Sequence, residues 1–237
     1  MKKLVKFGVV ALALSAVAPA FAQDAEVQND YEAVGWTPVA IGLASPVQLP
    51  WGSHLWDVFG LDLNVLWADA PKMYGLGIGG VAMATRDDMM GLQVSALCNW
   101  ATKDVYGMRA TLGANIAFGT TYGFEAGCFA YRTGDMWGWD SEFLGSYQQN
   151  FWGLQCAGLI NLTLGQSYGC SLALGGNMAT VAYGFQAGGF NFTDELHGCQ
   201  IGLVNYARTC PWGFQIGIVN IIMDNQVKVL PIVNGYF

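Results

Sequence analysis

Charged residues are scarce in this 237-residue chain: 11% of its positions are Asp, Glu, Lys or Arg, whereas 53% are apolar. The 17 acidic residues outnumber the 10 basic ones, and no basic stripe is present. This balance excludes a nucleic-acid-binding protein, because the phosphate backbone would be repelled. Beyond the first residues, no stretch of about 18 consecutive apolar residues occurs, so the sequence predicts no membrane-spanning helix.

Catalytic and metal-binding motifs are also missing. The two histidines, His54 and His197, lie far apart, and the chain has no CxxC, HExxH or GxSxG motif. We therefore predict no enzyme activity, no catalytic residue, no cofactor and no metal site. Asp87-Asp88 and the pair Asp140 and Glu142 could bind a cation, but solvated carboxylates in turns or in a lumen are the favoured interpretation.

Six cysteines are present, an even number that permits disulfides in an oxidising compartment. Five of them occupy strand-like segments in place of Leu, Val or Ala. We interpret them as fillers of small apolar positions, and the sequence leaves their oxidation state open.

The N-terminus has the composition of an export signal. Basic Lys2, Lys3 and Lys6 precede an apolar run and the small residues around Ala22. Residues 1–22 are therefore predicted to be a signal peptide that is cleaved after Ala22. Residues 23–34 are polar and acidic, which indicates a flexible lead-in, and residues 35–237 are predicted to form a single repeat-built β domain.

A glycine recurs every 14–16 residues through this domain, which indicates a repeat architecture. The repeated glycines are Gly60, Gly75, Gly91, Gly107, Gly123, Gly138, Gly153, Gly169, Gly184, Gly198 and Gly213. Side chains around each glycine alternate between an apolar and a polar or small type, which is typical of a strand with two unlike faces. An Asn follows many of the glycines after seven or eight residues, as at Asn161 and Asn205.

The apolar face begins with a large ring, and the polar face carries amides and charges. The rings predicted to form an aromatic belt are Tyr74, Tyr106, Tyr122, Trp137, Trp152, Tyr168, Tyr183 and Trp212. The residues predicted to face a lumen are Asp62, Gln93, Arg109, Glu125, Gln155, Gln186, Gln200 and Gln215. Arg109 and Glu125 fall at the same position of successive repeats, so they are expected to pair across strands.

Two architectures satisfy this pattern. A strand of about ten residues and one turn per repeat favour an antiparallel meander that closes into an outer-membrane β-barrel of about 12 strands. Lipid would then cover the apolar face, and the rings would form belts at both water interfaces. The alternative is a β-solenoid of 14–16-residue repeats, in which the apolar face is buried and the Gln and Asn side chains form ladders.

The repeat core Gly-x-Gln-x-Gly-x-x-Asn, seen at 198–205 and 213–220, resembles a family of exported surface-repeat proteins of Gram-negative bacteria. The segment 200–207 is also similar to curlin repeats. The first resemblance implies export to the cell surface, and the terminal Phe237 resembles the signal read by the outer-membrane assembly machinery. The sequence thus predicts a non-enzymatic outer-membrane barrel in contact with membrane lipid, with a narrow pore as one form of it. The alternative is a secreted or cell-surface β-solenoid, or a fibre-forming surface protein, that acts in adhesion or matrix.

Overall fold

The computed structural model describes residues 33–236, so the expectations for the signal peptide at 1–22, for most of the lead-in at 23–34 and for Phe237 lie outside it. The one helical segment in this part, the short 3-10 turn η1, falls far short of the length that a membrane-spanning helix needs. All other elements are strands. In chain order, the elements are β1 (Gly35–Ala44), β2 (Val47–Leu49), η1 (Ser53–Leu55), β3 (Trp56–Ala70), β4 (Met73–Gly79), β5 (Ala82–Thr85), β6 (Met89–Ser95), β7 (Cys98–Ala101), β8 (Val105–Thr111), β9 (Ala114–Ala117), β10 (Thr121–Arg132), β11 (Met136–Gln148), β12 (Phe151–Ala157), β13 (Ile160–Ile222) and β14 (Val229–Gly235).

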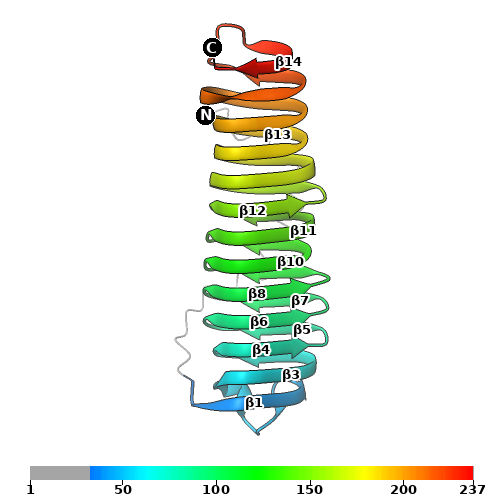
Figure 1. Cartoon of the computed structure of the whole chain (residues 1–237). Coiled ribbons are helices and arrows are strands. Elements are labelled where there is room, and N and C mark those ends of the chain that lie inside the picture. The colour runs from blue at the N-terminus through cyan, green and yellow to red at the C-terminus, as the bar shows by residue number, and fades with distance from the viewer. Residues whose placement is uncertain (1–32, 237) are drawn as a thin grey trace, which may run out of the picture. The chain divides into compact units, whose positions relative to one another are not determined.

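The strands stack in parallel, rung upon rung, as a β-solenoid (Figure 1). Gly75 lies opposite Gly91, and Gly91 opposite Gly107, in parallel register. The predicted barrel and its antiparallel meander are therefore wrong, and the predicted alternative, a solenoid of 14–16-residue repeats, describes the fold. A repeat of nearly constant length lets each copy lie directly on the last one, with like residues in contact.

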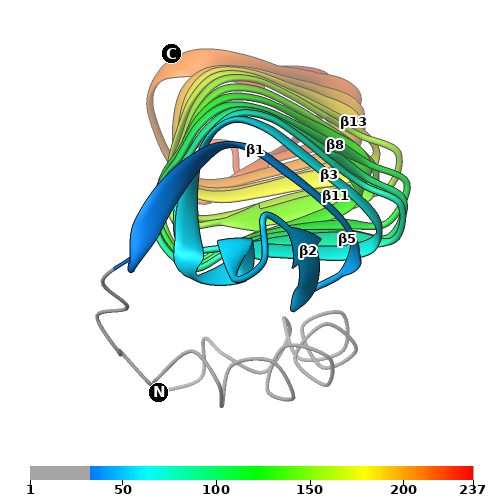
Figure 2. The same ribbon diagram turned by 90° about the horizontal axis from the view of Figure 1, so that it is seen from below.

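Each rung has two extended segments instead of the single ten-residue strand predicted. They are separate strands in rungs such as β8 and β9, and they run on as one strand in β10, β11 and β13. In one rung, β8 leads to a bend at Leu112 and Gly113. After this bend, β9 runs along the other side of the rung to a turn at Gly119 and Thr120. First strands pair with first strands, as β6 does with β8, and second strands with second strands, as β7 does with β9. The rungs thus wind around a narrow interior (Figure 2). We call the stacked first segments the first sheet and the stacked second segments the second sheet, although both belong to one continuous 14-stranded sheet. We call the bend after the first strand the corner and the line of turns the seam.

The recurring glycine is required by the stacking. All eleven repeated glycines have a positive φ, between 117° at Gly169 and 146° at Gly60, a region that other residues rarely adopt. A Cβ at Gly138, for example, would overlap the carbonyl oxygen of Gly123 in the rung before. The glycine recurs in the sequence because each rung makes one such close backbone contact with the rung before it.

Both ends of the stack are covered by strands that break the parallel pattern. β14 pairs antiparallel with the last rung of β13, and it contains Pro231, which has no N–H to donate. At the other end, β2 pairs antiparallel with β1, and prolines flank β2 at 46 and 50. Such end strands hinder the addition of a further chain to the edge of the sheet.

The apolar part of the interior lies next to the seam. Its largest cluster contains Ala68, Met73, Met83, Met89, Ala101, Val105 and Ala117, and a second contains Ala179, Ala182, Leu196, Ala207, Cys210 and Ile222. Toward the corner, the buried side chains are polar. The interior is therefore divided along its length into an apolar half and a polar half.

Candidate functional site: an apolar outer wall around a polar interior

The eight residues predicted to face a lumen all point inward, but each is at most 3% exposed. They do not line a water-filled channel, as the barrel required. Instead most of them are hydrogen-bonded from rung to rung: the Gln200 amide donates to Gln186 at 2.9 Å, and the Gln215 amide donates to Gln200 at 2.8 Å. Asp62 accepts from Asn64 of its own strand at 2.6 Å. A polar face packs in a dry interior when its neighbours satisfy its hydrogen bonds.

The recurring asparagines form a second ladder beside the corner. Asn205 donates one hydrogen bond to the side chain of Asn220 and one to the carbonyl of Ile216, both at 2.8 Å, and it accepts one from Asn191 at the same distance. Asn161 and Asn177 repeat this arrangement. The ladders predicted for the solenoid alternative are confirmed, but the burial of its apolar face is not.

Four buried charges interrupt the ladders and neutralise one another. Arg109 pairs with Glu125, as the sequence predicted, and Arg132 pairs with both Glu125 and Asp140. Although burial raises the pKa of the Glu125 carboxyl, the two guanidinium groups hold it below its ordinary value. Arg132 comes from the second strand of its rung, and the sequence analysis did not find it. Two cations and two anions give this cluster no net charge.

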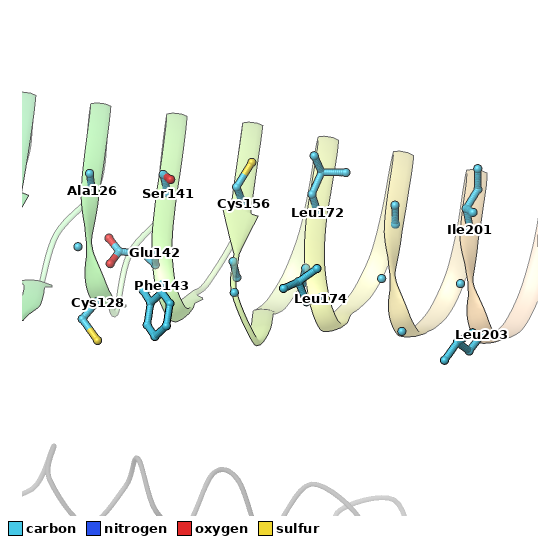
Figure 3. A pocket seen from close by; sticks show the side chains of 18 of the residues that line it. Ala126, Cys128, Ser141, Glu142, Phe143, Cys156, Leu172, Leu174, Ile201 and Leu203 are labelled. Atoms are coloured by element: carbon cyan, nitrogen blue, oxygen red, sulfur yellow. The ribbon is translucent and has the colours of Figure 1, made fainter.

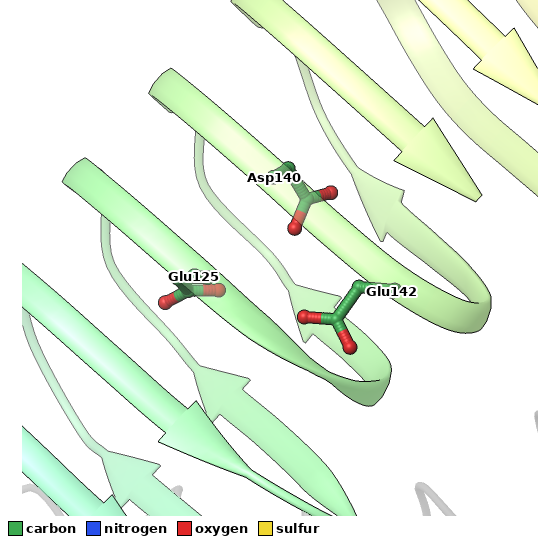
Figure 4. A group of neighbouring side chains, drawn as sticks. All are labelled: Glu125, Asp140 and Glu142. Atoms are coloured by element: carbon green, nitrogen blue, oxygen red, sulfur yellow. The ribbon is translucent and has the colours of Figure 1, made fainter.

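Glu142 adds a third carboxyl to this place, beside Glu125 and Asp140 (Figure 4). The three carboxylates approach closely enough to bind a metal ion, but the Arg132 guanidinium already lies between Glu125 and Asp140. Burial and the nearby Asp140 carboxylate raise the pKa of Glu142 to about 9, so it holds a proton at neutral pH. The prediction that Asp140 and Glu142 are solvated is wrong, since they are 0% and 3% exposed.

Glu142 fills a gap in the Asn ladder. Ala130 and Ser146 occupy the ladder position in the two rungs between Asn115 and Asn161. The Glu142 carboxyl projects into that space and accepts a hydrogen bond from Asn115 at 3.3 Å, while its Oε2 atom has no protein partner. The cluster thus takes the place of the missing ladder asparagines, which indicates a structural role in the interior.

The outer surface has the opposite character. The residues predicted as belts form one column along the side of the solenoid, not two belts, and the rings of adjacent rungs from Tyr106 to Tyr183 stack on one another. Trp137 lies 4.1 Å from Trp152, and Tyr168 lies 4.4 Å from Tyr183, between ring centroids. His197 stacks on Tyr183 in the same column. Parallel stacking brings the rings together because every rung starts at the same side of the molecule.

Beyond this aromatic column, the first sheet presents two more outward columns that contain no Asp, Glu, Lys or Arg. Leu61, Leu76, Leu92, Met108, Phe124, Trp139, Leu154, Cys170, Phe185, Cys199 and Phe214 form the middle one. Leu63, Ile78, Val94, Ala110, Ala126, Ser141, Cys156, Leu172, Ala187, Ile201 and Ile216 form the one nearest the corner. We call these three columns the apolar wall.

An open groove of about 1790 Å³ follows the corner from Val94 to Ile232 (Figure 3). One side consists of wall residues, and the other of a row of strongly exposed apolar side chains. This second row, the corner row, contains Leu112, Phe143, Leu174, Leu203 and Ile218, which are between 54% and 84% exposed. Small residues such as Gly188 and Gly202 form the floor.

The six cysteines are free thiols. Cys128 and Cys156 line the groove, and Cys210 is buried beside the seam, where burial raises the pKa of its thiol to about 11. Burial also raises the pKa of the Cys98, Cys156, Cys170 and Cys199 thiols, so these five thiols are not activated as nucleophiles.

Comparison with known proteins gives no relative: no family model, no curated protein and no solved structure matches this chain. The resemblances to surface-repeat proteins and curlin repeats therefore remain predictions from the sequence.

Proposed function

We propose that this protein is a non-enzymatic β-solenoid of the cell envelope that is exported and attaches to its partner through the apolar wall and the corner row. One observation carries this proposal: hydrogen-bonded polar residues fill the interior near the corner, while Leu, Ile, Phe, Trp and Tyr cover the outside. Large contiguous apolar surfaces mark sites of interaction on folded proteins. The predicted signal peptide supports export.

A surface role of this kind is closer to the predicted solenoid alternative, adhesion or matrix, than to a pore. The end strands β14 and β2 favour a discrete particle over a fibre that grows end to end. We therefore assign attachment to the long side of the solenoid.

The test is fractionation of a Gram-negative host that produces the full chain. We expect the processed protein in the envelope fraction, with release by detergent but not by high salt, because the wall carries no charge. A variant in which Leu174 and Phe143 are both changed to Asp should shift to the soluble fraction. Recovery of the unchanged protein in the cytoplasm, or in a soluble fraction without detergent, contradicts the proposal.

A further inference from the structure

The polarity of the cross-section reverses between the seam and the corner. At the seam, the outside is polar and the inside is apolar. Asp104, for example, accepts a hydrogen bond from the backbone of Thr120 at 2.7 Å, and Lys103 pairs with Asp87 at 2.8 Å. The Met and Ala cluster lies beneath these groups. This half is organised like a protein in water.

At the corner, the order is the opposite. Leu112 and Leu174, each 84% exposed, cover an interior of hydrogen-bonded asparagines. Proteins that face lipid place apolar side chains outside and satisfy their polar groups internally, since hydrocarbon offers no hydrogen bonds. The corner half therefore has the arrangement expected for contact with acyl chains.

The aromatic column lies between these halves, next to the seam. Tyr and Trp side chains combine an apolar ring with a polar tip, and they are enriched where lipid meets water. From the seam to the corner, the surface passes from charged groups to Tyr and Trp and then to Leu, Ile and Phe. This order matches the gradient from water through headgroups to acyl chains.

We infer that the solenoid lies lengthwise on a phospholipid membrane, with its corner row among the acyl chains, its aromatic column among the headgroups and its seam in water. The inference rests on the proposed function and identifies its partner as lipid. The groove runs past nine repeats, or about 40 Å at about 4.8 Å per strand. An open groove of that length is suited to a continuous layer of acyl chains rather than to one small molecule.

The first experiment is flotation of the full-length protein, isolated from the envelope in detergent, with phosphatidylcholine vesicles after detergent removal. We expect binding that is insensitive to added salt and to anionic lipid, because the wall has no charge. Changing Phe143 and Leu174 to Asp should reduce the bound fraction at least about tenfold. The matched variant, with exposed Gln149 and Gln166 of the seam changed to Asp, should lose less than about twofold.

Depth measurements avoid the risk that a charged variant misfolds. Nitroxide labels are attached to Leu174→Cys and, separately, to Gln166→Cys, with the native cysteines changed to Ala. Label 174 should be more accessible to oxygen, and label 166 to a water-soluble quencher. Equal accessibility at the two positions overturns the proposed orientation.

The outcomes also separate this inference from the proposed function. Envelope attachment in cells without binding to pure lipid vesicles would leave the function standing and refute lipid as the partner. A soluble dimer that does not float would assign the corner row to a second copy of the chain and likewise overturn the inference.

Discussion

Changing Glu142 to Gln is expected to stabilise the protein at neutral pH. The buried Glu142 carboxyl has a pKa of about 9, compared with an ordinary value of 4.5. Between these two pKa values, the unfolded chain releases this proton while the folded chain keeps it. The stabilisation that comes from protonated Glu142 is therefore fully present below about pH 4.5, and it is lost as the pH rises toward 9.

The size of the expected stabilisation follows from the difference between the two pKa values. Each pH unit in this window changes the free energy of unfolding by about 1.4 kcal/mol. From pH 4.5 to pH 7, the cost of protonating Glu142 on folding reaches on the order of 3 kcal/mol. An amide at position 142 has no proton to take up, keeps the acceptor for Asn115 and presents an N–H group near the Asp140 carboxylate. Relaxation of the surroundings makes 3 kcal/mol an upper limit.

The assay is urea unfolding followed by circular dichroism at pH 5, 7 and 9 in one non-ionic detergent. The advantage of the Glu142→Gln variant over the natural protein should be small at pH 5 and grow with pH. Asp224→Asn is the control, because it replaces an exposed carboxyl by an amide. It should change the free energy of unfolding by less than about 0.5 kcal/mol at every pH. Parallel pH profiles for the natural protein and the Glu142→Gln variant would refute the reasoning.

Three further predictions concern other parts of the solenoid. Gly138→Ala should destabilise by about 3–5 kcal/mol, since it adds overlap with the preceding rung to the cost of a positive φ. Gly52→Ala, at a glycine with a positive φ in open space, should cost about 1 kcal/mol. Equal midpoint shifts for the two in thermal unfolding would contradict the role of stacking. Arg132→Met should cost about 3–5 kcal/mol in urea unfolding, because it leaves Glu125 and Asp140 without their shared cation; an unchanged midpoint would show that the cluster is solvated. Alkylation of the unfolded chain without reductant should add six groups by mass spectrometry, and fewer would indicate a disulfide.

The sequence predicts the faces of the strands but not their direction. Alternation around each glycine correctly separates an outward column such as Tyr168 from an inward one such as Gln155, because a period of two holds for any strand. The same alternation serves a parallel and an antiparallel stack equally well. The direction of successive strands, and the second strand in each repeat, therefore had to come from the structure.

One signal did favour the parallel stack. Gln200 and Gln215 lie at the same position after their glycines, and so do Asn205 and Asn220. In an antiparallel barrel, equivalent residues of successive repeats do not face each other, so there is no reason for them to be identical. In a parallel stack they touch, and identical amides then form ladders. The recurrence of the same amide at the same position of each repeat is thus a stronger indication of a parallel stack than the length of the repeat.

The sequence could not separate a wet interior from a dry one. Gln, Ser and Asn are satisfied equally by water in a lumen and by each other in a packed interior. Asp140 and Glu142 looked like solvated carboxylates because their partners, Arg132 and Asn115, lie in earlier rungs and have no local signature. Only the stacking brings these groups together.

The end strands and the apolar wall together determine how this molecule can associate. Backbone hydrogen bonds are directional and would extend the stack indefinitely, but Pro231 and the antiparallel β14 hinder that route at one end, and β2 does so at the other. Apart from the polar tips of its aromatic column, the wall offers few hydrogen-bonding groups, and the corner row offers none, so attachment through them is largely non-directional and grows with the apolar area covered. A particle of this kind is suited to coating a continuous apolar phase, because such a phase needs no matching pattern of donors. The length of the repeat array then sets the strength of attachment, since each added rung contributes further outward apolar side chains without changing the ends.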